Sequence, residues 1–188
     1  MELHPIALGA IIAAVITGLL SLLGLIISKE QKTSEFRQQW IDCLRNDIAE
    51  LLGNIESAIQ HIRAIKNDIN AQPSAGVSNS VVFERIKGDI REAERLYHQI
   101  LLRINPDEHK KISDILEEMR EEFNKGDIPS SEEFHKLEQK LIKITQSVLK
   151  KEWNRVKDGE PAFKIAKYVS IIFILTVFVI GIYGTVST

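Results

Sequence analysis

IALGAIIAAVITGLLSLLGLII, residues 6–27, is the stretch that decides the fold, because none of its side chains is ionisable. A helix needs about 20 apolar residues to cross the hydrocarbon core of a bilayer. A second apolar stretch lies at residues 165–186 and is free of charge from Tyr168 onward. The sequence therefore predicts transmembrane helices at residues 6–28 and 165–186, with a polar region at residues 29–164 between them.

The basic residues indicate how the two spans are oriented. All 24 Lys and Arg residues lie between Lys29 and Lys167, and neither end of the chain has any. Lys and Arg near a span are retained on the cytoplasmic side of the membrane. We therefore expect a multi-pass protein whose polar region is cytoplasmic and whose termini are both external. The segment before Ile6 also lacks the positive n-region of a signal peptide, which argues against cleavage.

Apolar residues recur every three or four positions in the polar region, and no strand period occurs. The first predicted helix, residues 33–70, continues from the first span because no Gly or Pro lies between Gly24 and Gly53. Residues 71–80 are expected to form a loop. The predicted fold class is all-α: two transmembrane helices flanking a cytoplasmic antiparallel helical bundle.

Two local signals set the boundaries of the later helices. Asn105 and Pro106 are expected to close the second helix and to open the third, as its N-cap and first helical residue. Ser130-Ser131-Glu132-Glu133 is a capping box that predicts the start of the fourth. This fourth helix should run to the Gly159 to Pro161 break.

Composition and charge indicate which partners the chain can bind. The chain has 24 basic and 26 acidic residues and a net charge of −2, so it has no electrostatic footprint for nucleic acid. The basic cluster before the second span is interpreted as a topology signal and as a set of contacts to anionic lipid head groups. Its members are Lys150, Lys151, Arg155, Lys157, Lys164 and Lys167. The single Cys43 cannot form an intramolecular disulfide. Membrane lipids, further copies of the chain and a cytoplasmic protein are the expected partners.

Few residues suggest a catalytic, cofactor-binding or metal-binding role. No phosphate loop, Ser-His-Asp order or zinc spacing is present, so neither a cofactor nor a metal is expected. Glu132 and His135 have the spacing of half a di-iron site, but the second half is missing. Arg103 and His109 lie at a helix junction, and their spacing resembles that of the HEPN ribonuclease superfamily, where an Arg and a His from two protomers act on RNA. The alternative is that they lie in a solvated turn.

The first span carries a ridge of small residues in two rows, each with a spacing of four. Such ridges let helix backbones approach closely in lipid. We expect the ridge to pack against the second span or against copies of the same chain. Its members are Gly9, Ala13, Thr17 and Ser21 in one row, and Ala10, Ala14 and Gly18 in the other.

The segment after the first span, FRQQWIDCLRNDI at residues 36–48, resembles a juxtamembrane segment of small bacterial membrane proteins with a cytoplasmic helical domain. Some of these occur in phage-defence settings. The layout is also similar to that of the membrane accessory protein of type VI CRISPR systems, an oligomeric pore-forming protein with a HEPN-like fold. Residues expected to couple the spans to the helical region are Phe36, Trp40, Leu44, Ile48 and Trp153.

These observations favour a non-enzymatic homo-oligomer of the bacterial inner membrane, with a helical domain that senses or assembles and spans that act on the membrane. The resemblance implies a pore-forming or membrane-perturbing defence effector. One alternative is a membrane-anchored scaffold that recruits a cytoplasmic partner. The other is a HEPN-like ribonuclease that uses Arg103 and His109.

Overall fold

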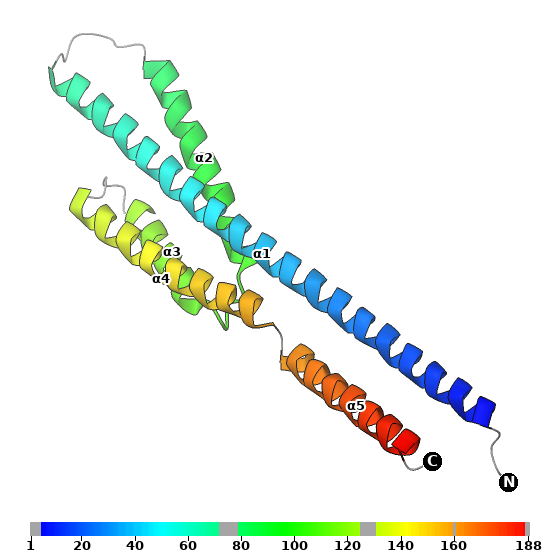
Figure 1. Ribbon diagram of the computed structural model, residues 1–188. Helices are drawn as coiled ribbons and strands as arrows, with labels where there is room; N and C mark the ends of the chain where they lie inside the picture. Colours follow the sequence, from blue (N-terminus) through cyan, green and yellow to red (C-terminus); the bar gives the residue numbers. More distant parts are fainter. Residues whose placement is uncertain (1–4, 72–78, 125–130, 160, 187–188) are drawn as a thin grey trace. The chain divides into compact units, whose positions relative to one another are not determined.

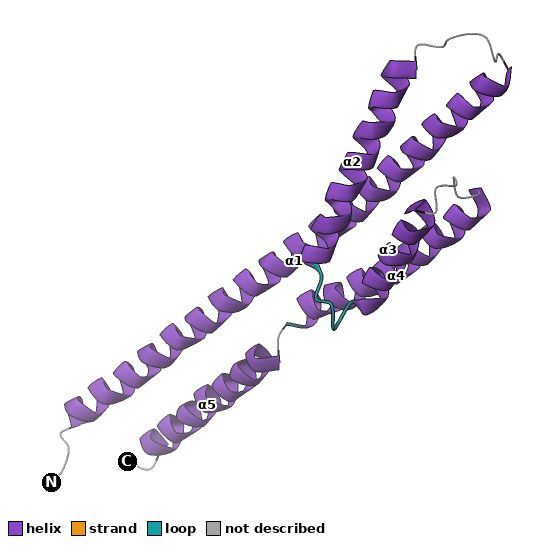
Figure 2. Ribbon diagram, turned by 180° about the vertical axis from the view of Figure 1, so that it is seen from behind, coloured by secondary structure: helices purple, strands orange, loops and turns teal. Residues whose placement is uncertain are grey.

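The computed structural model describes residues 5–71, 79–124, 131–159 and 161–186. These residues form helices and short turns, and none of them is in a strand (Figures 1 and 2). The all-α prediction is therefore confirmed. The helices are α1 (Pro5–Ala71), α2 (Asn79–Arg103), α3 (Lys110–Asn124), α4 (Ser131–Asp158) and α5 (Pro161–Val186).

Helix α1 is continuous over 67 residues, from the first apolar stretch into the polar region. The prediction that the span runs on into the first amphipathic helix is confirmed. Much of the predicted loop, residues 72–78, and the Ser130 position of the capping box lie outside the described residues.

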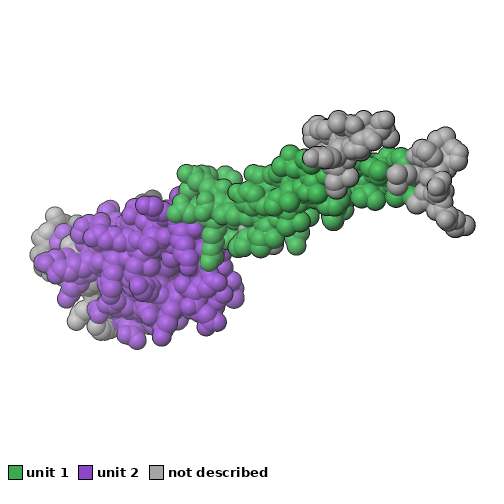
Figure 3. All heavy atoms as spheres, turned by 60° about the horizontal axis from the view of Figure 1, so that its bottom comes forward, with its two compact units in different colours: residues 1–38, 153–188 green, residues 39–152 purple. Residues whose placement is uncertain are grey.

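The chain divides into two compact units (Figure 3). Unit 1 contains residues 1–38 and 153–188, so it combines the beginning of α1, the end of α4 and α5. Unit 2 is the continuous segment Gln39–Glu152. The compact helical unit thus begins and ends about ten residues inside the predicted boundaries of the polar region, residues 29–164.

Unit 2 is built around one apolar core to which four helices contribute. Each helix is amphipathic, and burial of its apolar stripe away from water is the main favourable contribution to folding. The fully buried side chains include Leu44 from α1, Leu96 and Ile100 from α2, Leu116 from α3 and Leu141 from α4.

Polar contacts join neighbouring helices of unit 2 at the edge of this core. On α2 the Tyr97 hydroxyl donates a hydrogen bond to the Glu117 carboxylate of α3, and the Arg120 guanidinium lies 4.9 Å from the Tyr97 ring centroid. Burial, and then the contact with Glu117, raise the pKa of Tyr97 above its ordinary value. Lys140 of α4 forms an ion pair of 2.7 Å with Glu118 of α3. Such exposed pairs contribute only a few tenths of a kcal/mol, so the core determines stability.

The junction between α2 and α3 differs from its prediction. The third helix begins at Lys110, so the expectation that Asn105 and Pro106 open it is wrong. The Asn105 side chain does accept a hydrogen bond from the Asp107 N–H at 3.0 Å, as a cap would. However, residues 105–109 form a single separate turn, closed by the His109 N–H on the Asn105 carbonyl at 2.9 Å. A local capping signal therefore starts a turn here that does not continue as a helix.

The junction between α4 and α5 follows the sequence closely. Gly159 ends α4 with a φ of +71°, and its N–H donates to the Arg155 carbonyl at 3.1 Å. This is the left-handed helix cap that glycine favours. Pro161 is then the first residue of α5, where its missing N–H costs nothing.

Replacing Gly159 by alanine is expected to destabilise the protein by about 1–2 kcal/mol. The residue has a positive φ, and an added Cβ atom would lie 3.1 Å from Glu30 Oε1 and 3.3 Å from Phe163 Cδ1. Gly53→Ala is the matched control, because Gly53 lies inside α1 in open space. There alanine should stabilise by about 0.5–1 kcal/mol. Urea unfolding of the full chain in detergent, followed by far-ultraviolet circular dichroism, should give opposite signs, and equal signs would contradict the cap.

Candidate functional site

The first candidate site is the apolar end of α1. By length and composition, α1 is the one helix among the described residues that meets the criterion for crossing a membrane, and none of its most apolar window is buried. A core helix of a soluble protein would hide that surface instead. Large side chains such as Leu20, Leu22 and Leu25 are more than half exposed. Membrane insertion of both apolar stretches stays a prediction, and the side chains of α5 beyond Val179 lie outside the described residues.

The structure places the small-residue ridge on the exposed surface of α1. All seven of its residues are exposed, and beta carbons added at Gly9 or Gly18 would meet no atom within 4 Å. Thr17 Oγ1 donates a hydrogen bond to the Ala13 carbonyl at 2.9 Å, so its hydroxyl is satisfied inside the helix. Nothing within the described part of unit 1 covers this ridge.

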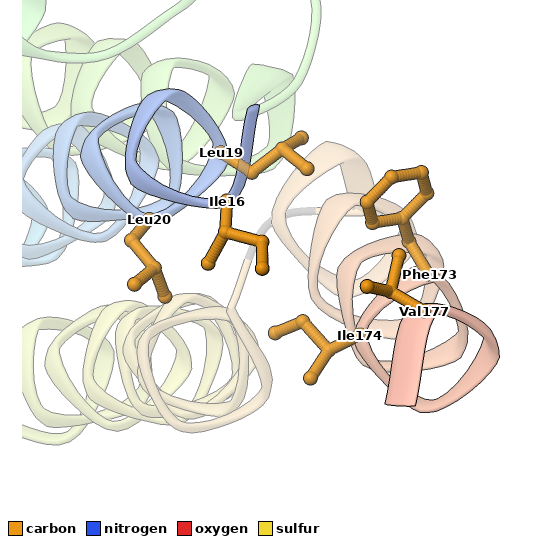
Figure 4. A pocket seen from close by; sticks show the side chains of 6 residues that line it. All are labelled: Ile16, Leu19, Leu20, Phe173, Ile174 and Val177. Atoms are coloured by element: carbon orange, nitrogen blue, oxygen red, sulfur yellow. The ribbon is translucent and has the colours of Figure 1, made fainter. Parts of the chain in front are cut away.

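A different face of α1 lies toward α5. Ile16, Leu19 and Leu20 of α1 line an apolar pocket of about 150 Å³ together with α5 residues (Figure 4). The α5 residues of this pocket are Phe173, Ile174 and Val177. On α1 the partly covered positions are Leu19, Leu23 and Ile26, which recur with helical spacing on this face. Among the described side chains, α5 therefore meets α1 at Ile16, Leu19 and Leu20 and leaves Gly18 uncovered.

The residues expected to couple the spans to the helical region fall into two groups. Phe36 and Trp153 belong to unit 1, where they are 68% and 40% exposed. The Lys157 ammonium lies 5.8 Å from the Trp153 ring centroid. Leu44 and Ile48 are buried in the core of unit 2, with Trp40 packed against that core. Sequence periodicity places Phe36, Trp40, Leu44 and Ile48 on the apolar stripe of α1 and Trp153 on that of α4, but it does not separate core positions from exposed ones.

The second candidate site is the pair Arg103 and His109, both in unit 2. The Arg103 Nε atom donates to Asp47 Oδ2 at 2.8 Å, and Gln99 donates to Asp47 Oδ1 at 2.8 Å. Asp47 is 6% exposed, so its charge is buried and needs these donors. The Arg103 carbonyl also accepts the Trp40 indole N–H at 2.9 Å. Arg103 therefore joins the end of α2 to α1.

His109 is buried in the turn before α3, with 9% of its surface exposed. Its ring lies 5.4 Å from the Trp40 ring, centroid to centroid, at an interplanar angle of 31°. Its Nδ1 atom accepts the Asn105 N–H at 3.3 Å. Neither a solvated turn nor an open catalytic pair describes this arrangement, since both residues take part in packing and hydrogen bonding within unit 2.

The structure adds one cluster that sequence spacing could not reveal. Ligand atoms of Glu108, His109 and Glu152 all lie within 4.8 Å of one another, where the turn before α3 meets the end of α4. Three such groups can bind a cation. However, Nδ1 of His109 accepts the Asn105 N–H, so this ring nitrogen is already used within the turn. Glu108 and Glu152 also take part in other polar interactions. We do not assign a metal to this cluster.

The Glu132 and His135 pair is used for other contacts. His135 Nδ1 lies 3.0 Å from Glu138 Oε2, and Glu132 lies 2.9 Å from the Lys136 ammonium. Both are pairs on the exposed surface of α4, and they need no metal to explain them.

Comparisons of the chain with protein-family models, with curated proteins and with solved structures found no match.

Proposed function

We propose that the chain is a non-enzymatic homo-oligomer of the bacterial inner membrane. Its two spans cross the bilayer, its helical region lies in the cytoplasm, and both termini are external. The observation that carries the proposal is the exposed small-residue ridge on the apolar end of α1, where a Cβ atom added at Gly18 would meet no described atom within 4 Å.

A small-residue ridge that is left exposed promotes the association of helices in lipid. Hydrophobic burial does not drive helices together inside a bilayer, because lipid tails are as apolar as leucine. Close backbone approach at Gly, Ala, Ser and Thr positions supplies the packing energy instead. Gly18 has open space beside it, so a helix from a second copy can come close there. This arrangement supports an oligomer formed through α1.

The juxtamembrane resemblance suggests what such an oligomer does. Proteins with the segment at residues 36–48 include members in phage-defence settings, and the similar CRISPR accessory protein forms pores. We therefore propose that the assembly perturbs or permeabilises the membrane when the cytoplasmic region is engaged. The first span has no charged side chain, so a pathway through it would be lined by small and apolar residues.

The experiment is a mass measurement on the full chain in nanodiscs by light scattering, corrected for lipid and scaffold protein. Wild type should give a defined multiple of 21.3 kDa, and Gly18→Leu should give a monomer. Gly18→Ala keeps the ridge small and should retain the oligomer. Ile27→Phe adds bulk at a position that is 45% exposed and on the opposite side of the helix from Gly18, and this variant should also retain the oligomer. A monomeric wild type would overturn the proposal.

The scaffold function is the second candidate, because unit 2 presents an exposed apolar residue. Leu102 of α2 is 89% exposed, so its side chain is accessible to a protein partner. A scaffold would keep its phenotype when both spans are replaced by a foreign anchor. The oligomer proposed above would lose its phenotype in that exchange.

A further inference from the structure

A polar pocket lies within unit 1, where α4 ends and α5 begins. It has a volume of about 430 Å³ and is lined by Arg37, Arg155, Asp158, Gly159, Pro161 and Lys164. This volume falls in the range of about 300–1,000 Å³ that is common for small-molecule sites. The lining carries three basic side chains and one acidic side chain, and the Glu30 carboxylate lies beside Gly159, so basic groups still outnumber acidic ones around the pocket.

Helix α5 adds to this preference. The pocket includes Pro161, the first residue of a helix of 26 residues with no acidic residue in its first turn; Glu160, which precedes Pro161, lies outside the described residues. The free N–H groups at a helix N-terminus, together with the helix dipole, bind phosphate groups. Arginine can bind a phosphate through two parallel N–H groups, and lysine supplies a point charge. Arg37 and Arg155 also take part in other polar interactions, but a guanidinium has five donors, so it can add a phosphate to its existing partners.

The surroundings of the pocket favour a lipid over a soluble phosphate. Lys164 is followed directly by the apolar stretch of α5, and Ile165, Tyr168 and Val169 are each at least 60% exposed. An anion bound at Lys164 therefore lies next to a surface that acyl chains can cover. The acidic residue of the lining, Asp158, is also compatible with a lipid, because it can accept hydrogen bonds from head-group hydroxyls.

We propose that this pocket binds the phosphodiester of an anionic phospholipid with a hydroxylated head group, such as phosphatidylglycerol. The proposal rests on the proposed membrane insertion of the chain. It assigns a binding role to Arg155 and Lys164 that goes beyond the general attraction of basic residues to anionic membranes.

The test is a binding titration on the full chain in a neutral detergent, with native mass spectrometry as the readout. The probes are short-chain phosphatidylglycerol, short-chain phosphatidylcholine and glycerol 1-phosphate. Lys164→Gln and Arg155→Gln should each weaken phosphatidylglycerol binding about fivefold. Lys167→Gln is the matched control, because Lys167 is exposed on the same helix but does not line the pocket.

Three outcomes would overturn the proposal. Equal affinity for the two lipids would remove the anion preference. Equal weakening by Lys164→Gln and Lys167→Gln would replace the pocket with a diffuse charge effect. Binding of glycerol 1-phosphate as tight as that of the lipid would identify a soluble phosphate site instead. Oligomer mass is measured on the same samples, so a retained oligomer without selective lipid binding refutes the pocket alone, whereas a monomer refutes the proposed function.

Discussion

Replacing Leu96 by alanine should lower the free energy of unfolding of unit 2 by about 3 kcal/mol. Leu96 lies on α2, is 0% exposed and belongs to the core cluster. Truncating it removes buried apolar surface and leaves a cavity that a close-packed core fills only in part. The measurement is urea unfolding followed by fluorescence in a Trp153→Phe background, which leaves Trp40 of unit 2 as the single reporter.

The matched control is Leu102→Ala, the same substitution on the same helix. Leu102 is 89% exposed, so its truncation should change the free energy of unfolding by no more than about 0.5 kcal/mol. Similar losses for Leu96→Ala and Leu102→Ala would show that α2 does not bury the face described above.

This pair of leucines also shows how far periodicity predicts a helix face. Helical periodicity alone places Ile90, Tyr97 and Ile100 on one side of α2 and leaves Leu96 out of that set. Tyr97 and Ile100 are buried, but Ile90 is 49% exposed, and Leu96, which was not among them, is fully buried. Where a helix has apolar residues on two adjacent faces, the partner helices decide which face is buried, and a single sequence does not contain that information.

The continuity of α1 was predictable because it depends on local properties. Residues between Gly24 and Gly53 include no helix breaker, and the helix passes through them without interruption. The α4 to α5 junction was predictable for the same reason, since Gly159 and Pro161 act through their own backbone. By contrast, tertiary packing decides which side of the apolar end of α1 contacts α5. The sequence does not determine that side.

The contacts of Arg103 were not predictable from the sequence. Spacing alone associates Arg103 with His109, whereas the structure pairs it with Asp47, far away in the chain. Asp47 lies on the buried stripe of α1 between Leu44 and Ile48, so an acidic residue with apolar neighbours was the available signal. A charge at such a position requires a partner, but only the fold identifies which one.

Asp47→Asn should therefore destabilise unit 2 by about 2–3 kcal/mol. The substitution leaves Arg103 without its counter-charge and weakens the acceptor for Gln99. The loss should be smaller than for a fully buried pair, because the Arg103 side chain is 25% exposed and water screens part of its charge. Urea unfolding followed by Trp40 fluorescence measures this loss of stability, since the Trp40 indole is hydrogen-bonded to the Arg103 carbonyl.

Asp42→Asn is the control, because Asp42 forms an ion pair of 2.7 Å with Arg45 on the exposed side of α1. An exposed pair of this kind contributes less than about 1 kcal/mol, so its loss should be near the error of the measurement. If Asp42→Asn and Asp47→Asn have equal effects, the buried pair is not a stabilising contact and Arg103 is free for another role.

The double variant Asp47→Leu with Arg103→Met extends this test to function. Replacing both members of a buried pair by apolar residues removes their desolvation cost, so stability should recover to within about 1 kcal/mol of wild type. A ribonuclease that depends on Arg103 would be inactive in this folded variant. The proposed membrane oligomer should keep its mass and its phenotype, because the ridge on α1 is unchanged. A stable double variant that has lost its phenotype would therefore favour a direct role for Arg103 over a structural one.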